Sequence, residues 1–321
     1  MNDVSVSIVN YKSSKLIEDC IQSIIDLTFD LNYEIIVVDN NSNDDIEEII
    51  SKFEKIKLIK LEKNIGFAAA NNIALELSNS EFFLLLNPDT YLKNNALKIL
   101  FNFMKVNQNC AISCPQLYYP NGKAQQSYTN FRTPYQRMMW DLYPLLSKLK
   151  VYKIFKKLKN KSLPKKNSIN IDKQERFKKI ERPRGVCFFV RKSMIKIIGP
   201  MDERFFMYCE EVDWAYRFFN SGYENYICYE AKVFHIWGGT SKTQKHKLNQ
   251  IQIQSDYKYF MKHFGVFGLL QILFGNFFAS ILCLNFIILY FTKKKRRNLY
   301  FNKFKFHLEC LFLLTKKIKI E

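Results

Sequence analysis

The sequence lacks the cysteine spacing of a zinc ribbon or a dithiol redox site. None of its eight cysteines forms a CxxC pair, and Cys110 and Cys114 have no second pair with which to hold zinc. We therefore expect buried thiols in a reducing compartment. A charged segment is also absent ahead of the first apolar run, which begins at Val4, so we expect no signal peptide.

Most of the chain lacks a net charge, because the total of +19 comes from two segments. Residues 148–182 hold 14 basic and 3 acidic side chains, and residues 292–321 hold 10 basic and 2 acidic, which leaves the rest neutral. A DNA-reading domain more often spreads its basic residues over one folded face. Two detached basic segments instead predict attraction to an anionic membrane surface and no nucleic-acid partner.

What the chain does contain is a repeated alternation of strand and helix patterns. Three short apolar runs, Val4–Val9, Ile35–Val38 and Phe82–Leu86, are typical of parallel strands buried on both faces. Short connections separate them from helical and further strand patterns, expected at 15–27, 44–53, 56–61, 68–77 and 95–106. The alternation predicts an α/β fold with a doubly wound, mostly parallel sheet flanked by helices.

Each of the three runs stops at a polar residue. Asn10, Asp39 and Asn87 stand at these stops. In an open α/β sheet, ligands bind beyond the carboxyl ends of the strands. We therefore expect these side chains to face a ligand.

Regular patterns resume after the basic segment. We expect a strand at 184–190, a helix that opens at Glu210 and runs to Phe219, and short strands at 226–229 and 232–235. Gly222 is a plausible end for the helix.

The segment Asn87-Pro88-Asp89 suits a divalent cation that carries phosphate. Carboxylate oxygens are hard ligands for Mg²⁺ or Mn²⁺, so Asp89 is the expected protein ligand and Asn87 a neutral helper. The alternative is a turn without a ligand. His235, at a strand end before a Gly-Gly turn, is a second candidate contact to metal or diphosphate, with a structural histidine as the alternative.

Three acidic residues lie in the first turn of the helix predicted to begin at Glu210: Glu210, Glu211 and Asp213. Helix capping explains one of them. Adjacent carboxylates raise one another's pKa, which suits one for taking a proton near neutrality. These residues alone do not decide which acid is the base.

In order along the chain, these motifs resemble family 2 glycosyltransferases of the GT-A fold, in particular the bacterial rhamnosyltransferase and galactofuranosyltransferase type. The resemblance covers roughly residues 4–240 and rests on five segments: Val6–Tyr11, Val37–Ser42, Asn64–Ala68, Asn87–Asp89 and Phe205–Asp213.

The resemblance implies roles for single residues. Glu211 falls at the general base, and Asp89 with His235 would hold the Mg²⁺ or Mn²⁺. Glu210 stays an alternative base, with Asp213 beside the pair, because this subgroup usually has Glu-Asp where this chain has Glu-Glu. The expected nucleotide-sugar contacts are Asn10, Tyr11, Asp39, Asn41, Gly66, Asn71, Asn87, Arg184 and Gly185.

The resemblance also implies a reaction. It is an inverting transfer from a nucleotide-diphosphate sugar, of dTDP-rhamnose or UDP-sugar type, to a hydroxyl of a lipid-linked or cell-surface glycan. One alternative is a sugar nucleotidyltransferase, but Asn10-Tyr11-Lys12-Ser13 lacks the Gly-rich basic loop expected there. The other is an inactive membrane-bound scaffold with a transferase-like core.

The last part of the chain predicts membrane association. Residues 264–292 contain no charged side chain, and this uncharged stretch is long enough to span a membrane. A single span would place the basic run 293–297 across the membrane from a domain that uses cytosolic donors, against the positive-inside tendency. We therefore favour a hairpin or in-plane helices, helped by a basic amphipathic helix over residues 142–158.

The expected organisation is a GT-A domain over residues 1–262 and a membrane-associated helical tail over 263–321. Within the domain, 1–115 form the nucleotide-binding half, 116–182 a basic insertion and 183–262 the catalytic half. The expected location is the cytoplasmic face of the cell membrane.

Overall fold

The computed structural model describes residues 2–148, 175–236 and 245–313. These form two compact units. Unit 1 contains residues 2–131, 175–236 and 245, and unit 2 contains residues 132–148 and 246–313. The helix after residue 133 belongs to unit 2 because it packs with the C-terminal helices.

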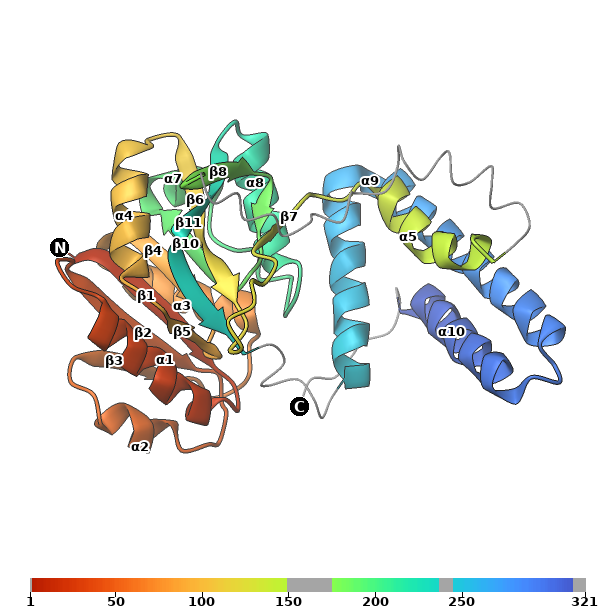
Figure 1. Ribbon diagram of the computed structural model, residues 1–321, viewed down its shortest axis with the longest axis horizontal. Helices are drawn as coiled ribbons and strands as arrows, with labels where there is room; N and C mark the ends of the chain where they lie inside the picture. Colours follow the sequence, from red (N-terminus) through yellow and green to blue (C-terminus); the bar gives the residue numbers. More distant parts are fainter. Residues whose placement is uncertain (1, 149–174, 237–244, 314–321) are drawn as a thin grey trace. The chain divides into compact units, whose positions relative to one another are not determined.

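Unit 1 alternates strands and helices along the chain (Figure 1). Its first half contains β1 (Asn2–Asn10), α1 (Ser14–Leu27), β2 (Tyr33–Asp39), α2 (Ile46–Ser51), β3 (Ile56–Lys60), α3 (Phe67–Leu77), β4 (Ser80–Leu86), β5 (Thr90–Leu92) and α4 (Ala96–Val106). Its second half contains β6 (Cys110–Tyr118), β7 (Tyr128–Thr129), β8 (Phe177–Ile180), β9 (Arg182–Pro183), β10 (Cys187–Arg191), α7 (Lys192–Ile198), α8 (Glu210–Asn220) and β11 (Glu224–His235).

The central sheet has the strand order β3-β2-β1-β4-β10-β6-β11-β5, with β8 paired to β11. Its first four strands are parallel, as expected. β10 then runs antiparallel between β4 and β6, and β11 runs parallel to β6. The expected strands 226–229 and 232–235 are one strand, β11, with a register shift between Cys228 and Lys232.

Helices cover both faces of the sheet. The apolar strands supply both layers, because alternate side chains of β4 enter opposite cores: Phe82 and Leu84 pack with α1 and α4, whereas Phe83 and Leu85 pack with α3, α7 and α8. The prediction of strands buried on both faces is confirmed. All eight cysteines are buried free thiols, also as predicted.

Unit 2 is helical. It contains α5 (Pro134–Leu146), α9 (Lys245–Leu289) and α10 (Lys294–Phe312). α5 begins with a capping box at Thr133, and α9 bends at Gly265, whose φ of 65° and ψ of −166° are not helical. Of the predicted helix over 142–158, residues 142–146 lie in α5, and the part beyond 148 lies outside the described residues.

Candidate functional site

The sheet topology brings the predicted site residues to one edge of unit 1. The parallel strands β1, β2 and β4 end there at Asn10, Asp39 and Leu86. Because β10 is antiparallel to β4, its start at Cys187 lies beside Leu86, and the backbone N–H of Asn87 donates to Val186 O at 3.0 Å. β11 runs in the same direction as β4, so it also ends at this edge.

Asn10 organises the first polar cluster. Its side-chain amide donates to Asp39 Oδ1 at 2.9 Å, and also to Ser42 and Asp44. Its Oδ1 accepts from the hydroxyl of Ser13. Asn10 is fully buried and saturated by these bonds, so it positions Asp39 while the half-buried Tyr11 and Asn41 stand at the rim.

The start of α3 forms the neighbouring wall. Gly66 has a φ of +92°, and a Cβ there would lie 2.4 Å from Phe206 O, so only glycine fits. Asn71 is buried, accepts from the Ser7 hydroxyl and donates to Phe67 O. The structure therefore places Asn71 beneath this wall, where it ties α3 to β1.

Asp89 and His235, 146 positions apart in the sequence, meet because β5 pairs with the end of β11. Asp89 Oδ1 lies 3.4 Å from His235 Nε2. His235 Nδ1 donates to Gln125 Oε1 at 2.8 Å, which leaves Nε2 as the nitrogen that faces Asp89. All three side chains are buried.

This pair fits a divalent cation that is shared with a ligand. A separation of 3.4 Å lets both atoms contact one ion at ligand distances of about 2.1 Å. A histidine ligand held through its other nitrogen is also typical of metal sites. Within the described ranges no three His, Cys, Asp or Glu side chains gather to form a protein-only cage, so the remaining ligands would come from elsewhere, such as a diphosphate.

Glu210 and Glu211 open α8 and have different surroundings. Glu210 is 5% exposed, and burial together with the Glu211 carboxylate raises the pKa of Glu210 well above its usual range. The Glu211 side chain is 20% exposed and lies 3.9 Å from Arg182 Nη1. One oxygen of each carboxyl, Oε2, is buried without a hydrogen-bond partner among the described residues.

Gly185 gives Glu211 its space. A Cβ on Gly185 would lie 2.6 Å from Glu211 Cγ, so any larger side chain there would displace the carboxylate. Arg184 is half-buried beside it, and burial together with the nearby Arg182 lowers the pKa of Arg184. A negatively charged group at this edge would relieve that crowding of positive charge.

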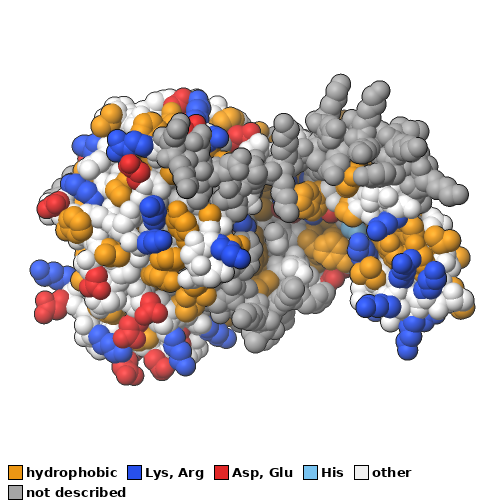
Figure 2. Space-filling model, in the orientation of Figure 1, with side chains coloured by type: hydrophobic (Ala, Val, Ile, Leu, Met, Phe, Trp, Pro, Cys, Tyr) orange, Lys and Arg blue, Asp and Glu red, His pale blue; other side chains and the backbone are white. Residues whose placement is uncertain are grey.

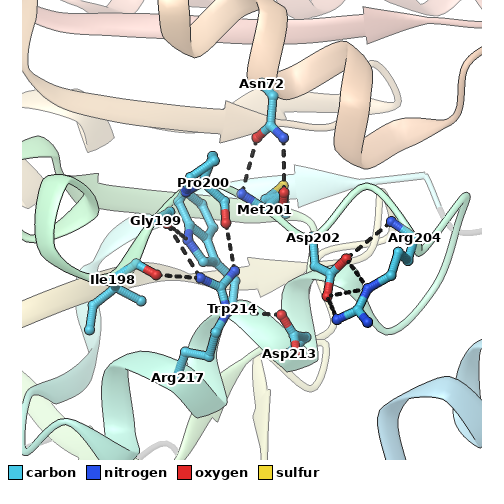
Figure 3. Close-up of polar contacts among 10 residues, drawn as sticks. All are labelled: Asn72, Ile198, Gly199, Pro200, Met201, Asp202, Arg204, Asp213, Trp214 and Arg217. Carbon is cyan, nitrogen blue, oxygen red and sulfur yellow. Dashed lines mark hydrogen bonds and ion pairs between the residues drawn. The ribbon is translucent and has the colours of Figure 1, made fainter. Parts of the chain in front are cut away.

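Asp213, the third predicted acid, has a structural partner. It is fully buried and accepts from Arg217 Nε at 2.9 Å. Arg217 also donates to the carbonyl oxygens of Ile198 and Pro200, which clamps the turn before α8 (Figure 3). The structure thus separates Asp213 from the Glu210–Glu211 pair and gives it a positioning role.

Sequence reasoning missed two residues of this site. Gln125 has no motif around it and becomes visible only through its bond to His235. Arg182 belongs to the two-residue strand β9, which pairs with β7 and brings it to Glu211. Arg182 stood in a long basic segment, so nothing in the sequence distinguished it from its neighbours.

Comparison with known proteins gives a consistent picture. The family described as "Glycosyl transferase family 2" matches residues 5–179, more than half of the chain. The chain is 26% identical over 222 residues to the low-salt glycan biosynthesis hexosyltransferase Agl10 of Haloferax volcanii, covering 68% of this chain and 62% of that protein. It is 25% identical over 227 residues to the dTDP-rhamnosyl transferase RfbF of Shigella flexneri, covering 65% and 62%.

These matches span less than two thirds of each relative's length. Among solved structures, the fold is similar to that of GalNAc-T7 crystallised with UDP, GalNAc and Mn²⁺, with a TM-score of 0.56 and 13% identity. That similarity covers 82% of this chain and 50% of the other, and at this identity it shows the GT-A fold alone.

Proposed function

Because this chain belongs to glycosyl transferase family 2, we propose that it moves a sugar from a nucleotide-diphosphate donor to a hydroxyl of a glycan acceptor, with inversion at the anomeric carbon. The observation that carries this proposal is the convergence of the hydrogen-bonded Asn10–Asp39 cluster, the Asp89–His235 pair and Glu211 at one edge of the sheet. The transfer needs all three: a site for the nucleobase and ribose of the donor, a site for its diphosphate, and a general base for the acceptor hydroxyl.

In this proposal Glu211 takes the proton of the acceptor hydroxyl as its oxygen attacks the anomeric carbon. Glu211 is favoured over Glu210 because burial raises the pKa of the Glu210 carboxyl well above its usual range, whereas the Glu211 side chain is 20% exposed. Asp39, held by Asn10, would accept hydrogen bonds from the nucleobase or the ribose of the donor. Arg184 would face the negative charge of the diphosphate.

Asp89 and His235 would hold the Mg²⁺ or Mn²⁺. When bound, that ion would offset the negative charge that develops on the nucleoside diphosphate leaving group. The neutral Asn87 in place of a second acid leaves this protein site with one carboxylate, so we expect modest metal affinity before the donor is bound.

The donor and acceptor classes are also proposals. RfbF is named as a dTDP-rhamnosyl transferase and Agl10 as a hexosyltransferase of glycan biosynthesis, and both names fit a dTDP-rhamnose or UDP-sugar donor and a cell-surface glycan. We propose that the acceptor is lipid-linked and that the protein works at the cytoplasmic face of the cell membrane. The apolar and basic helices of unit 2 support this location.

The test combines ligand binding with chemistry. A thermal-shift panel of nucleotide sugars with Mn²⁺ should identify one stabilising donor, and that donor should be hydrolysed slowly without acceptor and not at all with EDTA. Donor stabilisation without hydrolysis or transfer would instead indicate an inactive scaffold. A panel without any stabilising nucleotide sugar would contradict the proposed function.

The Glu211→Gln variant assigns the base. It should lower transfer of a radiolabelled sugar by about 10²- to 10⁴-fold, because the amide cannot take a proton. Donor affinity measured by calorimetry should stay near the wild-type value. Loss of donor affinity in this variant would contradict the role of Glu211 as base.

A further inference from the structure

Unit 2 carries a continuous apolar face on the second part of α9, residues 266–289. Its exposed side chains recur every three or four residues, which places them on one side of the helix. Phe267 is 83% exposed and Ile288 is 73% exposed. The face between them is formed by Leu270, Phe274, Phe277 and Ile281.

The opposite side of the same helix is already packed. A Cβ on Gly275 would lie 2.7 Å from Met138 Cγ, so α5 approaches α9 closely there. Farther along, Cys283 and Phe286 pack with Leu145 of α5 and Tyr300 of α10. The exposed face is therefore what remains after unit 2 has buried its own core, and an apolar surface of this kind marks an interaction site.

α10 places charge alongside the middle of this helix. Phe286 stacks on Tyr300 with ring centroids 4.7 Å apart, and Asn276 bonds His307 at 3.0 Å. Lys303 lies between these two contacts and is close enough to Cys283 to affect its pKa. If residues 266–289 crossed a bilayer, Lys303 and the buried Asn276–His307 pair would therefore lie near its centre, which is unfavourable for charged groups.

The charge on the turn before α10 and on the first part of α10 is of one sign. Residues 293–305 contain seven basic side chains and no acidic one. Lys294, Lys295, Arg296 and Lys305 are exposed, and Figure 2 shows blue and orange side chains side by side on the surface of this unit. An apolar face flanked by cations matches the acyl chains and anionic headgroups of a bilayer surface.

We propose that unit 2 docks in the plane of an anionic bilayer. The face from Phe267 to Ile288 enters the boundary between headgroups and acyl chains, and the basic residues of α10 contact the headgroups. Both ends of α9 then stay on one side of the membrane, although its 266–289 part is long enough to cross. This inference goes beyond the proposed reaction, and it does not depend on that reaction.

Vesicle sedimentation of the full chain tests the surface. The protein should bind phosphatidylcholine vesicles that contain phosphatidylglycerol, and bind pure phosphatidylcholine at least tenfold more weakly. A Phe274→Ser/Phe277→Ser variant should lose binding by tenfold or more, and a Lys294→Gln/Lys295→Gln/Arg296→Gln variant should lose most of the dependence on phosphatidylglycerol and on salt. The control Val106→Ser removes an apolar side chain of unit 1 that is 82% exposed, more than Phe274 or Phe277, and should bind as wild type.

A depth measurement distinguishes docking from crossing and stays informative if a variant folds poorly. Phe278→Trp places a fluorophore near the middle of the 266–289 part, and wild-type emission is subtracted. Quenching should be strongest with lipids brominated near the headgroup. Strongest quenching by bromine near the acyl-chain end would overturn the proposal, and so would self-association of the full chain without vesicle binding. Sugar transfer is not the readout, so failure here leaves the proposed function intact.

Discussion

At the scale of single residues, neighbouring acids acquire different chemistry from their surroundings. Glu210 and Glu211 are adjacent and identical in type, but Glu210 is buried and Glu211 borders Arg182 and Gly185. Asp213 forms an ion pair with Arg217. The division of labour among three acids therefore follows from burial and partners, and not from residue type.

Glu210→Gln should change how stability depends on pH. The pKa of Glu210 is raised in the folded state, so the folded protein binds a proton that the unfolded chain releases above about pH 4.3. This group therefore favours folding less and less as the pH rises toward its folded-state pKa. Glutamine mimics the protonated form and removes this loss, so the variant's Tm relative to wild type should rise between pH 5 and pH 8, the range chosen for the scan. A constant difference in Tm across that range would contradict a raised pKa of Glu210 in the folded protein.

At the proposed metal site, Gln125→Met should weaken metal binding without removing either proposed ligand. The change deletes the acceptor that fixes His235 Nδ1 and leaves Nε2 without a set orientation. We expect about a 10-fold rise in the Mn²⁺ concentration that gives half-maximal activity. Gln125→Glu keeps an acceptor at this position and is the matched control. An unchanged Mn²⁺ requirement in the Met variant would mean that Gln125 does not position His235.

At the scale of elements, short pieces connect the site to the rigid sheet. β5 is three residues long, yet it carries Asp89 to His235 through its pairing with β11. α8 presents Glu210 and Glu211 at its first turn, and Arg217 in its last turn ties α8 to the segment before it. Asn72 of α3 holds the same segment through two bonds to the Met201 backbone (Figure 3).

Arg217→Met should destabilise unit 1 strongly. It would leave the fully buried Asp213 carboxylate without its ionic partner, and loss of one member of a buried pair costs about 3 kcal/mol or more. The free energy of unfolding from urea titration checks this value. The double variant Asp213→Leu/Arg217→Met removes both charges and should be less destabilised than the single variant. Equal losses in both would indicate that the clamp on Ile198 and Pro200, and not the ion pair, carries the effect.

At the scale of the whole molecule, the chain divides into an α/β unit with the candidate site and a helical unit with the apolar face. Each unit has its own hydrophobic cluster among the described residues. Segments of both units alternate along the chain, because α5 and α9 of unit 2 flank the β8-to-β11 part of unit 1 in sequence.

Calorimetric unfolding should therefore show two transitions. By the proposed function, a nucleoside diphosphate with Mn²⁺ would bind folded unit 1 and should raise the transition of that unit alone, by mass action. Anionic vesicles should instead shift the transition of unit 2. A single transition that moves as a whole with the nucleotide would show that the two units unfold cooperatively.

The sequence by itself determined the local elements and much of the chemistry. Buried strands can be predicted because short unbroken apolar runs bounded by polar residues are typical of them. The polar residues at the ends of these runs indicate the edge of the sheet where a ligand binds, whatever the order of the strands. The same reasoning identified the uncharged stretch 264–292. These signals depend only on near neighbours along the chain, so they survive without knowledge of the fold.

Only the tertiary structure decided which distant residues meet. The insertion of antiparallel β10 between β4 and β6 brings Val186 to Asn87 and Gly185 to Glu211, and the pairing of β5 with β11 supplies the physical reason why Asp89 meets His235, as the family resemblance implied. Gln125 and the Asp213–Arg217 pair were invisible beforehand for the same reason. Such contacts arise from packing between segments far apart in the chain, which no local pattern encodes.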